Sequence, residues 1–161
     1  MDKLVEEGLV KNIGVCNLSV NRFKDVQKHT GNKVVCNQVH YSLNMRESET
    51  AGVIKYCQDN DIFITAWGPL EKGVLANAPI LQSMAKKYKK TSYQIALNWL
   101  ITQPNVITIP KTTDPKHLEE NLGALGWSLS PEDIIRLAKA FPNQQAKSDR
   151  LPLDYDADIG P

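Results

Sequence analysis

The chain has 161 residues, of which 19 are Lys or Arg and 18 are Asp or Glu, so its formal net charge is +1. This balance gives no electrostatic basis for binding a nucleic acid or an anionic membrane. Hydrophobic residues make up 42% and charged residues 23%, which is typical of a globular domain and excludes a disordered chain. No apolar run approaches the ~20 residues of a membrane span and no signal-peptide pattern opens the chain, so we expect a cytoplasmic protein.

Short apolar runs alternate with helical patterns along the chain. Strands are expected over residues 13–16, 34–39, 62–66 and 106–109, where β-branched and other apolar residues cluster. Helical spacing follows each of these strands. The first expected helix is capped by Ser19 and carries Val20, Phe23 and Val26 on one face, and three more are expected over 47–60, 80–88 and 92–102. A helix that begins at Asp114-Pro115 would turn Leu118, Leu122 and Leu125 inward. The last expected helix begins at Ser130-Pro131.

Alternating strands and helices predict an α/β fold with a parallel sheet. Four strands are compatible with a small open sheet or with half of a (β/α)8 barrel, whose complete form needs about 250 residues. We expect one domain over residues 1–141. Residues 142–161 are poor in large apolar side chains and are expected to form an extended C-terminal tail.

Cys16, Cys36 and Cys57 are an odd number of cysteines without the spacing of a zinc site. We expect three buried free thiols in a reducing compartment.

Ligands of parallel α/β folds bind at the carboxyl ends of the strands, so the residues after each strand are the candidate site. Lys111, Thr112 and Thr113 follow the last strand and precede a helix that begins at Asp114-Pro115. Hydroxyls, an ammonium group and free backbone N–H groups in that position are suited to phosphate. The same pattern also fits an ordinary capped helix with a solvated lysine.

Polar and aromatic residues end the other strands. Asn17 and Gln38 follow or end neighbouring strands, where their carboxamides suit either another amide or simple capping of the strand ends. Trp67 offers an aromatic plane for stacking, or packs in the core. His40 and Tyr41 are adjacent on a strand and therefore point to opposite faces, which argues against an acid–base pair.

Four segments together resemble the aldo-keto reductases, a family of NADP(H)-dependent carbonyl reductases built on a (β/α)8 barrel. They are residues 4–17 (LVEEGLVKNIGVCN), 37–41 (NQVHY), 64–70 (ITAWGPL) and 109–113 (IPKTT) followed by Glu120-Asn121. The resemblance implies that this chain is the second half of the barrel, strands five to eight, and so a four-stranded parallel half barrel.

The resemblance also implies a role for each matching residue. Residues 16, 17 and 38 would hold the nicotinamide carboxamide, residue 67 would stack on its ring, and residues 68–70 would run under the pyrophosphate. Residues after the fourth strand would grip the 2′-phosphate and face the adenine. The implied NADP(H)-binding residues are Cys16, Asn17, Gln38, Trp67, Gly68, Pro69, Leu70, Lys111, Thr112, Thr113, His117, Glu120 and Asn121.

Two residues depart from the family pattern, because Cys16 replaces a serine and His117 replaces an arginine. The family's catalytic Asp, Tyr, Lys and His come from the first four strands, so we assign no catalytic residue here. The implied function is reduction of a small-molecule aldehyde or ketone by a chain that represents the cofactor half. We expect a homodimer that rebuilds eight strands, or a separate N-terminal half. The alternatives are a non-catalytic nucleotide-binding or regulatory module and a truncated or engineered half barrel.

Overall fold

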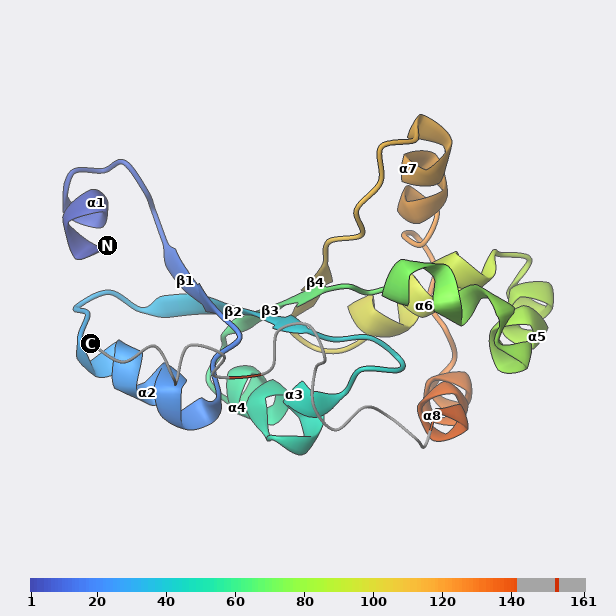
Figure 1. Ribbon diagram of the computed structural model, residues 1–161, viewed down its shortest axis with the longest axis horizontal. Helices are drawn as coiled ribbons and strands as arrows, with labels where there is room; N and C mark the ends of the chain where they lie inside the picture. The colour runs from blue at the N-terminus through green and yellow to red at the C-terminus, as the bar shows by residue number, and fades with distance from the viewer. Residues whose placement is uncertain (142–152, 154–161) are drawn as a thin grey trace.

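The computed structural model describes residues 1–141 and residue 153. Most of the predicted tail, residues 142–161, therefore lies outside the described residues. The elements alternate along the chain as an α/β fold, as the sequence predicts (Figure 1). In order they are α1 (Asp2–Glu6), β1 (Ile13–Cys16), α2 (Val20–Lys28), β2 (Val34–His40), α3 (Glu47–Thr50), α4 (Val53–Asp59), β3 (Phe63–Trp67), the 3-10 helix η1 (Glu71–Asn77), α5 (Pro79–Tyr88), α6 (Ser92–Ile101), β4 (Val106–Thr108), α7 (Pro115–Leu122) and α8 (Pro131–Ala140).

The four strands form one parallel sheet in the order β1-β2-β3-β4. Each strand after β1 therefore pairs with the strand that precedes it in the sequence. Figure 1 shows α2, α3 and α4 on one side of the sheet, with α7 projecting on the other side of the view. Because the strands are parallel, their carboxyl ends meet at one edge, where the candidate site residues were expected.

One face of the sheet carries the core. Val39, Ile64 and Ala66 are fully buried, and they belong to the same hydrophobic cluster as Trp99 and Leu100 of α6. These residues alternate with neighbours on the other face, as the two-residue period of a strand requires.

The opposite face of the sheet is only partly covered. Phe63 is 50% exposed and lies two residues before Thr65 on β3, while Ile107, the register partner of Thr65 on β4, is 49% exposed. Cys16, at the end of β1, is also exposed. The expectation of three buried thiols is therefore wrong, because only Cys57 is buried and Cys36 is half-buried.

Two helix predictions need correction. The helix expected over 47–60 is two helices, because Gly52 adopts the left-handed conformation (φ 74°) between α3 and α4. Such a residue ends the regular hydrogen bonding of an α-helix. The apolar stripe Leu118, Leu122 and Leu125 faces outward rather than to the core, since all three side chains are more than half exposed.

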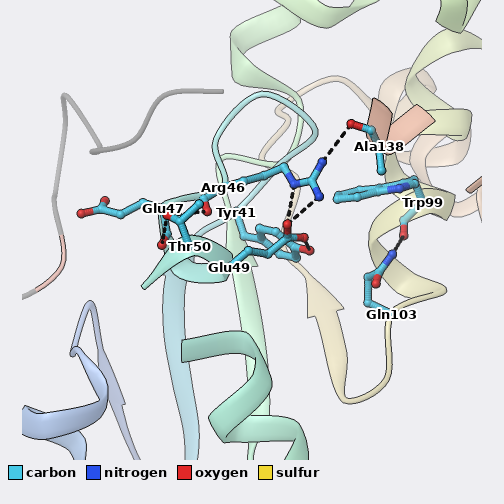
Figure 2. Close-up of polar contacts among 8 residues, drawn as sticks. All are labelled: Tyr41, Arg46, Glu47, Glu49, Thr50, Trp99, Gln103 and Ala138. Atoms are coloured by element: carbon cyan, nitrogen blue, oxygen red, sulfur yellow. Dashed lines mark hydrogen bonds and ion pairs between the residues drawn. The ribbon is translucent and has the colours of Figure 1, made fainter. Parts of the chain in front are cut away.

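A partly buried polar cluster lies between α3 and the residues of α6 and α8 (Figure 2). The Glu49 carboxylate accepts hydrogen bonds from the Tyr41 hydroxyl and from Arg46 Nε, the latter at 2.6 Å. The Arg46 guanidinium also donates to the Ala138 carbonyl at 3.2 Å and lies over the Trp99 ring. Burial, reinforced by the charge of Glu49, raises the pKa of Tyr41 well above its usual range. This cluster therefore ties the β2–α3 turn to α6 and α8.

A second cluster joins α5 to α8. Asp133 is buried, and its Oδ2 lies 2.5 Å from both Lys87 Nζ and the Tyr88 hydroxyl oxygen. The hydrogen bond from Lys87, followed by that from Tyr88, lowers the pKa of Asp133. Lys86 and Lys87 lie in the last turn of α5, and Lys87 has a specific partner in Asp133.

Candidate functional site

A cavity of about 540 Å³ lies beyond the carboxyl ends of β3 and β4. Its walls come from the segments that follow these two strands, from α7 and from one residue of α6. The structure brings many of the predicted site residues together in this lining, and adds others. The lining residues are Gly68, Pro69, Leu70, Glu71, Lys72, Gly73, Tyr93, Ile109, Pro110, Lys111, Thr112, His117, Glu120 and Asn121.

The α7 end of the cavity carries two cationic candidates on separate elements. Lys111 precedes α7 and His117 lies in its first turns, and both side chains are exposed. The start of α7 is also an ordinary capped helix, because Asp114 Oδ1 accepts from Lys116 N at 2.8 Å. Thr112 Oγ1 accepts from Asp114 N at 3.1 Å, so this hydroxyl helps to shape the turn. The ordinary capped helix is therefore observed, while phosphate binding at this turn stays a prediction.

Except for Thr113, the remaining predicted residues lie at the ends of β1, β2 and β3 and do not line the cavity. Cys16 and Gln38 are register partners, and the Asn17 backbone N–H donates to the Gln38 carbonyl at 2.8 Å. Asn17 adopts a left-handed conformation (φ 55°), and its Oδ1 accepts from Trp67 Nε1 at 3.1 Å. Three strand ends are thus connected by hydrogen bonds. Thr113 is exposed and lies outside this group and outside the cavity lining.

The sequence analysis missed the segment 71–73, which forms one wall of the cavity. Glu71, Lys72 and Gly73 all have left-handed backbone angles, with φ of 48°, 53° and 90°. A side chain at Gly73 would place a Cβ 3.3 Å from the Tyr93 hydroxyl, so this segment packs closely on α6. Gly73 was the one sequence signal for this turn, because glycine tolerates positive φ. Glu71 and Lys72 are not residue types that indicate a positive φ.

His40 and Tyr41 point to different partners, as predicted. His40 Nε2 lies 2.9 Å from Glu71 Oε1, whereas Tyr41 binds Glu49 on the other side of the strand. The His40 ring stacks on Trp67, with ring centroids 4.0 Å apart and planes 13° apart. These two residues are register partners in β2 and β3, which places their side chains on the same face.

Within residues 1–141, no cluster of three His, Cys, Asp or Glu side chains has the arrangement of a metal site. None of the helices that the structure describes is long and apolar enough to cross a membrane.

The model of the aldo/keto reductase family matches residues 1–141. The chain belongs to this family. It is 32% identical over 155 residues to the uncharacterized oxidoreductase YtbE of Bacillus subtilis, which covers 96% of this chain and 54% of YtbE. It is also 31% identical to a glyoxal reductase of the same organism, over 85% of this chain and 48% of that protein. The chain therefore spans about half the length of the curated relatives it matches.

Solved structures of aldo-keto reductases have the same fold. The thermostable aldo-keto reductase Tm1743 superposes with a TM-score of 0.82 at 34% identity, over 86% of this chain and 51% of that one. A further solved structure, a Gox0644 mutant in complex with NADPH, superposes with a TM-score of 0.79 at 26% identity, over 91% of this chain and 53% of that one. The four-stranded sheet of this aldo-keto reductase chain is thus a half barrel.

Proposed function

We propose that this chain is the nucleotide-binding half, strands five to eight, of an NADP(H)-dependent oxidoreductase that reduces aldehydes or ketones. One observation carries the proposal: residues that follow two different strands, together with α7, converge on a single cavity at the carboxyl end of the sheet. Parallel α/β enzymes bind their ligands at this edge.

The residues present match the chemical groups of a dinucleotide. Lys111 and His117 are suited to a phosphate monoester, since both side chains can carry positive charge and donate hydrogen bonds. Thr112 lies between them, and Glu120 and Asn121 line the adjoining wall, where they would face the adenine. The segment Gly68–Leu70 would run beneath the pyrophosphate.

The other end of the dinucleotide would lie at the connected strand ends. Trp67 provides an aromatic plane, while Asn17 and Gln38 provide carboxamides that suit the amide of nicotinamide. Cys16 is adjacent and exposed. When bound, the dinucleotide supplies the hydride for reduction of a carbonyl carbon.

We propose that the open face of the sheet is covered by a second half barrel. Its occupant is either another copy of this chain or an N-terminal half that supplies the acid–base residues. Exposed apolar side chains on this face and two strands without outer neighbours, β1 and β4, support the proposal. Uncovered faces and edges of this kind promote association.

Titration of NADPH into the purified chain, followed by nucleotide fluorescence, tests the proposed function. Saturable binding is expected, and Lys111→Gln should weaken it by about tenfold, the effect of losing one charge-assisted hydrogen bond to phosphate. Lys139→Gln is the matched control, because Lys139 is exposed on α8 away from the cavity. A folded chain that binds neither NADPH nor NADH contradicts the proposal. Binding without carbonyl reduction, even with an added N-terminal half, would favour a non-catalytic nucleotide-binding module.

A further inference from the structure

Three buried polar side chains meet beside the cavity, and neither the fold nor the expected nucleotide contacts account for them. Glu71 Oε1 lies 2.9 Å from His40 Nε2 and accepts a hydrogen bond from Ser42 Oγ at 2.8 Å. All three residues are at most 7% exposed. A single carboxylate oxygen therefore contacts both the end of β2 and the turn that follows it.

Packing alone does not require this cluster. Moving a carboxylate out of water is unfavourable, and apolar side chains of similar volume often give equal or greater stability at such positions. What the two hydrogen bonds add is a fixed position for the Glu71 carboxyl group relative to His40 and Ser42. Ser42 extends that geometry, because its Oγ accepts from the backbone N–H groups of Met45 at 2.9 Å and Asn44 at 3.2 Å.

The cluster is also connected to the aromatic plane of the site. The His40 ring that contacts Glu71 stacks on the Trp67 indole. The indole is held a second time through its Nε1, which donates to Asn17 Oδ1. One face of the indole is therefore set by His40 and its edge by Asn17.

The backbone at Glu71 needs to be held. Glu71 and Lys72 are consecutive non-glycine residues in the left-handed region, which is unfavourable for L-amino acids. Glu71 also lines the cavity. A contact that fixes the Glu71 carboxylate therefore fixes this wall of the cavity as well.

We propose that Glu71 is a positioning residue of the nucleotide site. Through His40 its carboxylate sets the plane of Trp67, and through Ser42 it holds the segment 71–73 in its left-handed conformation against the cavity. The inference rests on the proposed function, since the ligand that benefits is the nicotinamide dinucleotide. It assigns Glu71, His40 and Ser42 to the support of that site rather than to contact with the ligand's reacting atoms.

The test compares two replacements of Glu71 in the full chain. Glu71→Leu keeps the apolar volume but removes the acceptor, whereas Glu71→Gln keeps an oxygen that accepts from Ser42 and from His40. NADPH affinity should fall by about tenfold or more in the leucine variant, and by no more than about threefold in the glutamine variant. Glu49→Gln is the control, because Glu49 is also a hydrogen-bonded carboxylate, with Arg46 and Tyr41 as partners, and does not line the cavity.

A second measurement uses the fluorescence emission of the Trp67 indole and needs no nucleotide. Subtracting the emission of a Trp67→Phe variant isolates Trp67 from Trp99 and Trp127. Loss of the His40 stack should shift and strengthen this emission in Glu71→Leu and leave it unchanged in Glu49→Gln. Circular dichroism and a cooperative thermal transition show that each variant is folded.

The outcomes separate the inference from the proposed function. A folded Glu71→Leu protein with the affinity and the Trp67 emission of the unmodified chain would overturn the inference alone. If that variant does not fold, the NADPH affinity of Ser42→Ala replaces it as the test. We expect a several-fold loss of this affinity, and an unchanged affinity would overturn the inference. An unmodified chain that binds neither NADPH nor NADH overturns the proposed function, and the inference with it.

Discussion

At the scale of single residues, position 117 tests the proposed phosphate contact. An imidazole such as that of His117 has two ring nitrogens, whereas an arginine guanidinium can bind a phosphate through two parallel hydrogen bonds. In the proposed function Lys111 and His117 face the 2′-phosphate, the group that distinguishes NADPH from NADH. A substitution at position 117 should therefore change the affinity for NADPH and not that for NADH.

We expect His117→Arg to tighten NADPH binding by about 1–2 kcal/mol, because an arginine adds a charge-assisted, bidentate hydrogen bond to the phosphate. NADH affinity should stay nearly constant, because NADH lacks the 2′-phosphate. Parallel fluorescence titrations of both nucleotides measure this. Equal changes in affinity for NADPH and NADH would rule out the role of His117.

Sequence patterns located the strand-end residues but not the ones that support them. Trp67 and Asn17 follow strands and were predicted from that position alone, whereas the hydrogen bond between them joins residues 50 positions apart. Glu71 gave no signal, because its role depends on a left-handed backbone and on a partner from another strand. The Leu118 stripe was misassigned for a related reason: helical spacing shows that a helix has an apolar face but not what that face contacts.

At the scale of secondary-structure elements, α8 is attached to α5 through Asp133. Its folded-state pKa lies below the ordinary value of 3.8 because Lys87 and Tyr88 bind the charged form. A carboxyl group with a lowered folded pKa stabilises the fold at every pH above its unfolded pKa. That contribution is lost as the pH falls through the lower, folded-state value.

Asp133→Asn should therefore lower the free energy of unfolding by about 1–3 kcal/mol at pH 7, because it removes the buried acceptor of an ion pair. The difference between the variant and the unmodified chain should shrink below about pH 4. Urea unfolding at several pH values measures both effects. Asp59→Asn is the control, since Asp59 forms an exposed pair with Lys55 and should change stability by less than about 0.5 kcal/mol. A difference that persists undiminished in acid would contradict the assignment.

Most element boundaries were predictable, and the main error has a local cause. The four predicted strands match the observed ones within one residue, and Ser19 and Ser130 cap α2 and α8 as expected. The break between α3 and α4 falls at Gly52, which helical periodicity on either side concealed. Glycine within an apolar pattern is compatible with a continuous helix, so the spacing alone did not reveal the interruption.

At the scale of the whole molecule, the exposed side chains of the sheet face allow the proposed association to be tested. Phe63 and Ile107 lie on that face, at positions that a complete barrel would fill from inside. We expect an association state above the 18.0 kDa of one chain.

The double variant Phe63→Glu/Ile107→Glu should shift this protein toward the monomer, because charged side chains on a buried interface lose their hydration. Both side chains are exposed in the single chain, so each substitution should change the free energy of unfolding by less than about 0.5 kcal/mol. Light scattering coupled to size-exclusion chromatography gives the mass. A monodisperse 18.0 kDa species for the unmodified chain would refute self-association.

The sheet order β1-β2-β3-β4 has a consequence for synthesis on the ribosome. Every strand pairs with the strand made just before it, so no strand has to wait for a distant partner to emerge. Each new βα unit can dock on a surface that is already in place. The two strands that pair at each step are separated in the sequence by only one such unit. Nascent chains should thus gain protease resistance stepwise, in order from the N-terminus, as successive units leave the exit tunnel.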